Sequence, residues 1–308
     1  MIDVRLSAHR GAAPVRRRRT DDGRWALALL ALPLMGLGVF YVWPLVRTVA
    51  LSFSDGTPFR GYHLSGIGHW VEALSGGELG RALLNTLMYA AIVLLGVPLA
   101  MIIAAMLHQR GLRFRSGYRV FYFLPVVTMP VAVAMVWRYI YNGDFGLLNA
   151  ILQPLGLPAT AWVADPKTAL VAVAIVGIWM SLGTNIVILA AGMEAIPEEV
   201  TEAAMMDGAG PIRRFISVTA PLLSPSVFLV CVLSVISSLQ VFDVIFVMLG
   251  RMNPALGSVK SIVYLFYEAA FVRNDRPTGA VIALITLVVT ALLTFIQFRL
   301  QNRWVHYA

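Results

Sequence analysis

Among the stretches without a charged residue or histidine, six long apolar ones constrain this chain more than any other feature. Each is at least 18 residues long, and the charged residues gather between them. The stretches are residues 25–46, 82–107, 120–137, 168–193, 215–242 and 277–298. A helix needs about 20 apolar residues to cross a bilayer core, and the period-two alternation of membrane β-strands is absent from these stretches. The sequence therefore predicts an all-α membrane protein with six transmembrane helices. We expect the spans at about 25–50, 82–107, 119–141, 168–193, 219–248 and 277–299.

The overall composition agrees with a membrane protein. Only 13% of the 308 residues are charged, whereas soluble domains carry about 25%. In a membrane protein the net charge of +8 is explained by cationic cytoplasmic loops, so nucleic-acid binding is not expected. The single cysteine, Cys231, excludes an internal disulfide and a CxxC metal or redox site. His63 and His69 have no further His, Cys or acid cluster around them, so no metal site is expected.

The distribution of lysine and arginine predicts the orientation of the spans. Residues 1–24, 108–119, 194–214 and 299–308 hold 15 of the 24 basic residues. The positive-inside rule places these segments and both termini in the cytoplasm. We expect residues 1–24 to form a mobile basic tail and residues 25–308 to form one six-span domain. The first apolar run is longer than the core of a signal peptide, which favours an uncleaved anchor.

One internal segment, residues 196–216, is too charged and too short to span a membrane. Its central sequence is EEVTEAAMMDGAGPIRRF. Proline at 197 and the two glutamates after it are typical of a helix start, and Gly208 suits the left-handed position that ends a helix. The pattern predicts a short helix over about 197–207, followed by a second one from Pro211. Its small apolar face would consist of Val200, Ala203 and Ala204.

The same segment carries a family signature. Glu202-Ala203-Ala204 is followed after three residues by Gly208, and after nine more by Val218, Ala220 and Pro221. This arrangement resembles the cytoplasmic EAA signature of the integral membrane permease subunits of bacterial ABC importers. Ile and Leu are usual in that family where Val218 and Ala220 stand here.

Further stretches resemble the carbohydrate-uptake branch of these permeases, the maltose and glycerol-phosphate type, and in particular the first partner of a permease pair. They are FYFLPVVTMPVAVAMVWRYIY at 121–141, QVFDVIFVM at 240–248 and IQFRLQNRWVHY at 296–307. One departure is the sequence LGRMNPALGS at 249–258, where the family usually has a GGP-type loop. The resemblance covers most of residues 25–308 and implies a bacterial cytoplasmic (inner) membrane protein.

The resemblance also implies partners. They are a second permease subunit in a heterodimer, two ATPase subunits that bind ATP and Mg, and an extracytoplasmic solute-binding protein. This chain lacks a GxxxxGK[ST] loop, so we expect no cofactor on it and ATP hydrolysis on separate subunits. The implied ATPase-coupling residues are Glu202, Ala203, Ala204, Asp207, Gly208 and Arg213. The alternative, a helix lying on the lipid surface, is disfavoured because its acidic residues would face an anionic leaflet.

Polar residues inside two apolar runs are candidates for a translocation path, since polar groups are costly in lipid. The candidates are Trp179, Ser181, Thr184 and Asn185 in the fourth span and Ser234, Ser237, Ser238, Gln240 and Asp243 in the fifth. Helical spacing places the serines of the fifth span on one face, and the resemblance places sugar contacts on these two spans. The alternative is that the hydroxyls bond to their own helix or serve helix packing. We expect kinks at Pro125, Pro130, Pro221 and Pro225.

The predicted function is half of the translocation path of an ATP-driven importer for a sugar or sugar-like solute. A stand-alone carrier or channel is the alternative, but few acids lie within the spans and no inverted repeat is apparent. A membrane enzyme would need a nucleophile–base constellation, and the five scattered histidines do not provide one. The sequence leaves the solute open among a mono- or oligosaccharide, an amino sugar and glycerol 3-phosphate.

Overall fold

A computed structural model of the chain describes residues 22–57, 61–108 and 115–305. Most of the predicted basic tail (residues 1–24) and the centre of the 108–119 loop therefore lie outside the described residues. The chain divides into two units, residues 1–47 and residues 48–308, which are described separately.

The described part of the first unit is one apolar helix. It consists of α1 (Asp22–Leu37), the π-helical turn η1 (Gly38–Val42) and the start of α2 (Trp43–Ser52), which continues into the second unit. Residues Leu29–Ser52 are long and apolar enough to cross a membrane. Large apolar side chains such as Phe40 and Tyr41 are exposed along it. Extended exposed apolar surfaces of this kind mark sites of contact with a membrane or with another protein.

The second unit begins with a small hairpin, which the all-α prediction did not include. Strand β1 (Ser54–Thr57) pairs antiparallel with β2 (Gly61–Leu64), and Asp55 lies opposite His63. Gly56 and Gly61 both have positive φ angles, which glycine adopts without the steric cost of a Cβ atom. The all-α prediction is wrong for this stretch because these glycines let the chain reverse. Helix α3 (Gly68–Ser75) follows.

The second predicted span is one long helix, whereas the third is divided into two helices. Helices α4 (Glu78–Leu94) and α5 (Gly96–His108) together form one apolar helix of 31 residues. The expected span at 119–141 is instead divided into α6 (Arg115–Val127) and α7 (Pro130–Ile140), of 13 and 11 residues. The break falls before Pro130, where Met129 is extended, because a proline disfavours helical geometry in the residue before it. Short helices α8 (Leu147–Leu152) and η2 (Gln153–Leu155) follow.

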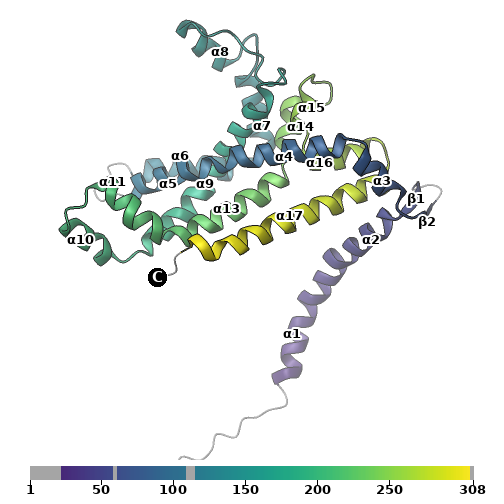
Figure 1. Ribbon diagram of the computed structural model, residues 1–308, viewed down its shortest axis with the longest axis horizontal. Coiled ribbons are helices and arrows are strands. Elements are labelled where there is room, and N and C mark those ends of the chain that lie inside the picture. Colours follow the sequence, from purple (N-terminus) through teal and green to yellow (C-terminus); the bar gives the residue numbers. More distant parts are fainter. Residues whose placement is uncertain (1–21, 58–60, 109–114, 306–308) are drawn as a thin grey trace, which may run out of the picture. The chain divides into compact units, whose positions relative to one another are not determined.

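Helix α9 (Ala169–Glu194) is the structural centre of the second unit. It packs against α4, α5, α6 and α13, as Figure 1 shows. The packing is close: a Cβ atom at Gly183 would collide with the backbone carbonyl of Tyr122 in α6. Small residues allow helix backbones to approach in this way.

After α9 the chain forms α10 (Glu198–Met206), α11 (Pro211–Arg214), the π-helical turn η3 (Phe215–Thr219) and α12 (Ala220–Leu222). Helix α13 (Ser224–Leu239) then begins after a bend of 69°. The bend lies between Pro221 and Pro225, two of the four predicted kink sites, and each proline removes a helical N–H donor. In Figure 1, α10 and α11 lie at the end of the second unit opposite to α3 and the hairpin.

The last elements close the bundle. They are α14 (Asp243–Leu249), α15 (Leu256–Val259), α16 (Ile262–Tyr267), the π-helical turn η4 (Glu268–Val272) and α17 (Arg276–Trp304). Within the described residues, four helices are long and apolar enough to cross a membrane, and counting the bent pair as one span gives five. The prediction of six transmembrane helices differs from this count because the third apolar run is divided at Met129 into two shorter helices.

Candidate functional site

The 196–216 segment forms a short helix with a well-defined end. Helix α10 starts after Pro197, which is its N-cap rather than its first helical residue. At the other end, the Gly208 N–H donates to Met205 O and the Ala209 N–H donates to Ala204 O, both at 3.0 Å. Gly208 has a φ of 74°. These two bonds around a left-handed glycine form a Schellman motif, which fixes the direction in which the chain leaves the helix.

The surface of this segment is open. Helices α10 and α11 contain no buried residue. Of the predicted coupling residues, only Ala204 is half-buried, and the other five are exposed: Glu202, Ala203, Asp207, Gly208 and Arg213. Large apolar side chains are exposed beside them, and Met206 has 88% of its surface accessible. Exposed apolar side chains with charged residues around them are typical of a site that contacts another protein or a membrane.

The predicted path residues of α9 have different environments. Thr184 is exposed, whereas Asn185 is 4% exposed. The Asn185 Nδ2 atom has no hydrogen-bond partner among the described residues. The Ser181 hydroxyl donates to the carbonyl of Ile178 at 2.9 Å, a bond within its own helix. Half-buried Trp179 lies edge-on to Trp137 of α7, with 6.1 Å between ring centroids. Among these four, Thr184 is the most exposed.

The polar residues of α13 are also partly buried and partly exposed. Ser234 and Ser238 are buried, while Ser237 is exposed. The Ser237 hydroxyl donates to the Ser234 carbonyl at 3.1 Å, and the buried Ser234 hydroxyl has no partner in the described part of the chain. Helix α13 packs against both α9 and α17. The serine face predicted from spacing is therefore partly an internal packing face and partly an open one.

Gln240 and Asp243 are exposed at the point where α13 ends and α14 begins. The exposed polar positions of α13 therefore extend to the junction with α14. With Thr184 and Ser237, these two residues are the four exposed members of the nine predicted path residues.

An aromatic cluster beside this break was not predicted from the sequence. Phe242 and Phe246 of α14 stack at 5.3 Å and contact Tyr264 and Tyr267 of α16 at centroid distances of 5.1 to 6.2 Å. Burial, followed by the Glu268 carboxylate, raises the pKa of Tyr264. The i, i+4 spacing of the phenylalanines was a visible signal, but their partners lie about 20 residues further along the chain.

A nearby ion pair also escaped prediction. The Lys260 Nζ and Glu268 Oε2 atoms are 2.5 Å apart and partly buried. The Ser261 hydroxyl donates to Val241 O at 2.6 Å and accepts from the Tyr264 N–H. The Ser261–Val241 bond ties the start of α16 to the break after α13, whereas the Lys260–Glu268 pair links residues on either side of α16.

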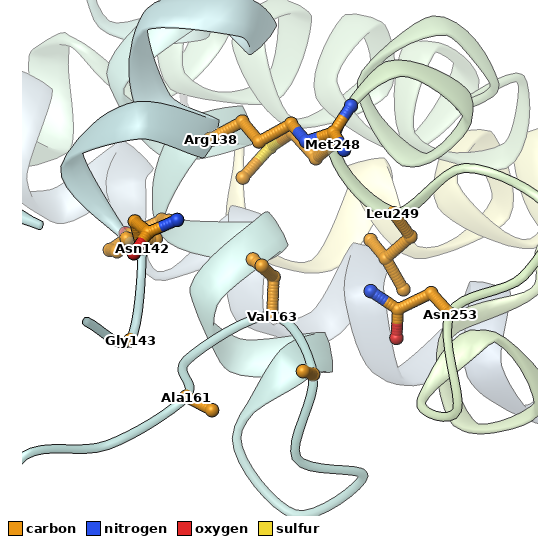
Figure 2. Close-up of a pocket in the computed structure, with 10 residues that line it drawn as sticks. Arg138, Asn142, Gly143, Ala161, Val163, Met248, Leu249 and Asn253 are labelled. Carbon is orange, nitrogen blue, oxygen red and sulfur yellow. The ribbon is translucent and has the colours of Figure 1, made fainter. Parts of the chain in front are cut away.

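The loop after α7 is organised by Asn149, which is 2% exposed. Its Nδ2 atom donates to the carbonyls of Gly143 and Thr160, and its Oδ1 atom accepts from Trp162 Nε1 at 2.8 Å. The loop borders a cavity of about 200 Å³. In Figure 2, Asn142 and Gly143 face Leu249 and Asn253 across the cavity. No predicted path residue is among its lining residues.

Two histidines lie in the region of the hairpin, His63 within β2 and His69 in α3. His69 Nδ1 is 3.0 Å from Thr278 Oγ1, and His69 Nε2 is 3.8 Å from Asp55 Oδ1. Within the described residues, no group of three His, Cys, Asp or Glu side chains has the arrangement of a metal site.

Comparison with known proteins identifies the family. Residues 96–306 match the family described as "Binding-protein-dependent transport system inner membrane component". The chain is 31% identical to the probable ABC transporter permease protein YesP of Bacillus subtilis (strain 168), covering 96% of this chain and 97% of that protein. It is 30% identical to the trehalose/maltose transport system permease protein MalF of Thermococcus litoralis, covering 88% and 92%.

The fold also matches a solved structure, a bacterial ABC transporter involved in the import of the acidic polysaccharide alginate. The TM-score is 0.80 at 20% sequence identity, and the match covers 92% of this chain and 96% of that one. The family match covers most of the chain and includes the signature segment, α9 and α13. The chain therefore belongs to the binding-protein-dependent transport system inner membrane components, the permease subunits of ABC transporters, which are membrane transport components rather than enzymes.

Proposed function

We propose that this chain is one of two permease subunits of an ATP-driven importer for a sugar or sugar-like solute. Family membership supports the transport role. The sugar class is supported by relatives named for trehalose/maltose, arabinooligosaccharides and sn-glycerol-3-phosphate transport. The solute itself stays open among these classes.

The proposed topology has six crossings with both termini in the cytoplasm. They are α1–α2, α4–α5, α6–α7 as a broken span, α9, α12–α13 as a bent span, and α17. The clustering of basic residues in the cytoplasmic segments supports this orientation. Reporter fusions after Gly210 and at the C-terminus should report cytoplasm, and a fusion at Ala159 should report the opposite side. A cytoplasmic signal at Ala159 would require a different number of crossings.

The coupling step is assigned to the 196–216 segment. The observation that carries the proposal is the exposed helix α10 ending in a Schellman motif at Gly208. A rigid end of this kind, connected through η3 and α12 to the bent span, can transmit a push on α10 to α13. Ala203 and Ala204 would allow a partner's backbone to approach closely. Glu202 and Arg213 would form charge-assisted contacts at the edge of the docked helix.

The proposed partners follow from the same assignment. Two ATPase subunits bind ATP and Mg and hold α10, a second permease completes the path, and a solute-binding protein delivers the solute on the other side. A protein of similar fold is a bacterial alginate ABC transporter whose crystal structure contains a periplasmic protein bound to alginate pentasaccharide. That complex supports the proposed arrangement by analogy of fold.

The proposed path follows the accessible polar residues Thr184, Ser237, Gln240 and Asp243. Hydroxyl, amide and carboxylate groups can exchange hydrogen bonds with sugar hydroxyls. The buried residues Asn185, Ser234 and Ser238 would support this surface from inside the bundle.

The proposal is tested by reversing the charge of Glu202. Glu202→Lys should weaken co-purification of the ATPase subunits and abolish coupled uptake, because it reverses the charge at the docked edge. Glu194→Lys, at the exposed end of α9, makes the same charge change outside α10 and serves as the control. If α10 lay on lipid instead, both changes would strengthen binding to an anionic leaflet and uptake would stay normal in both variants.

A further inference from the structure

Helix α3 is a short element at the ends of two long apolar helices, on the side away from the 196–216 segment (Figure 1). It contacts the start of α17 and the start of α4, and only Gly76 and Gly77 separate it from α4. The ends of two proposed membrane spans therefore fix its level relative to the bilayer.

One face of α3 packs against the protein. His69 Nδ1 lies 3.0 Å from Thr278 Oγ1 at the start of α17. The ring of Trp70 stacks on Phe53, with 5.9 Å between centroids and 28° between planes. Ala73, one turn after His69, is half-buried on the same side. These contacts determine which side chains of the helix point away from the protein.

A second face is apolar and uncovered. Ile67, Val71 and Leu74 are 63%, 57% and 65% exposed. At 100° per residue these three positions fall within one narrow stripe along the helix. Leu64, at the end of β2, extends the exposed apolar surface. Trp70 lies between this stripe and the packed face.

The third face is polar. It consists of Gly68, Glu72 and Ser75, all exposed, which lie about 100° around the helix from the apolar stripe. Helix α3 contains no lysine or arginine, so attraction to anionic lipid does not explain its apolar stripe.

We propose that α3 lies in the membrane–water interface, with Ile67, Val71 and Leu74 inserted among phospholipids and Glu72 and Ser75 in water. Only the choice of leaflet rests on the proposed function: it is the leaflet on the side of the membrane opposite to the 196–216 segment. An interfacial helix is expected to have an apolar face towards lipid and a polar face towards water. Helix α3 has both, and its remaining face packs against the protein.

Lipid fits this surface better than a protein does. A stable protein interface covers about 800 Å² on each partner, whereas the stripe is one row of side chains on an eight-residue helix. The adjoining span α4 also has an exposed large apolar residue, Leu84, at a proposed lipid-facing position. In this position α3 holds the ends of α4 and α17 at a constant depth while the rest of the bundle changes conformation.

The test uses single cysteines labelled with a small environment-sensitive fluorophore in the complete transporter, reconstituted in phosphatidylcholine vesicles. The native Cys231 is first replaced by alanine. Labels at Val71→Cys and Leu74→Cys should be quenched several-fold more by lipids with a nitroxide near the headgroup than by aqueous iodide. The label at Ser75→Cys, on the polar face of the same helix, should show the reverse preference.

Two results would overturn the proposal. Iodide quenching at Val71 and Leu74 equal to that at Ser75 would mean that the stripe faces water. Protection of Val71 and Leu74 from both quenchers would mean that protein covers the stripe. Solute uptake by the labelled vesicles is measured in parallel, so that a failure of lipid contact is distinguished from a failure of the transport assignment.

Discussion

Helix α9 and the 196–216 segment follow one another in the chain and differ in almost every physical property. Helix α9 has 26 residues, mostly apolar, and packs against seven other helices. Helix α10 has nine residues, two glutamates in its first turn and no buried residue. Its shape is maintained by local backbone bonds at Gly208, whereas α9 depends on its neighbours. Substitutions in α9 should therefore affect assembly of the protein, whereas substitutions in the 196–216 segment should affect its binding to a partner.

The largest effect is expected for Gly183→Leu in α9. A side chain there would collide with the carbonyl of Tyr122, and overpacking of this kind costs about 1–3 kcal/mol or more. The membrane level and the melting temperature of the assembled complex should both fall. Val187→Leu, one turn further along and exposed, enlarges a side chain at the surface of the same helix and should leave both values unchanged. A normal level of Gly183→Leu would contradict the description of α9 as the packing centre.

The second prediction concerns Asn185, which is buried and has an unpartnered Nδ2 atom among the described residues. Asn185→Asp should lower the melting temperature clearly, because an ionised carboxylate is costly in a dry interior. Asn185→Leu removes the unpartnered group at similar size and should be tolerated. The opposite order, with Asp tolerated and Leu destabilising, would indicate a wet path at this position. The comparable surface change Glu202→Gln should not alter the membrane level.

The smallest effect on assembly is expected in α13, where two adjacent serines have opposite environments. Ser237→Leu should reduce uptake while the complex assembles normally, because Ser237 is exposed. Ser238→Leu should lower the melting temperature modestly, because Ser238 is buried and overpacking strains a filled site. Uptake and melting temperature measured on both variants separate the two roles. Equal effects of the two substitutions would mean that burial does not divide the polar face.

Features with local causes could be predicted from the sequence. The helix expected at about 197–207 and the left-handed Gly208 are both present, because proline, acidic first-turn residues and glycine act within a few residues. The apolar run at 168–193 likewise corresponds closely to α9.

Features that depend on distant partners could not be predicted in this way. The break at Met129 is not such a feature, because it has a local cause and lies directly before Pro130, one of the expected kink sites. Helical spacing puts Ser234, Ser237 and Ser238 on one face, but the packing of α9 and α17 on α13 determines which of them are buried. The ion pair between Lys260 and Glu268 has no signature in the sequence, since its residues are eight positions apart.

The most direct test of the coupling role compares two glycines of the same segment. Gly208 has a φ of 74° and Gly210 has a φ of −63°, and a Cβ atom at either would meet no atom within 4 Å. Valine at 208 would therefore strain only the backbone, by roughly 1–2 kcal/mol, whereas valine at 210 fits the extended geometry before Pro211. Solute-stimulated ATP hydrolysis is measured on the reconstituted complex at matched membrane levels. We predict that Gly208→Val loses stimulated hydrolysis and uptake together while Gly210→Val keeps both. Normal stimulation in Gly208→Val would contradict the assignment of this segment as the link to the ATPase.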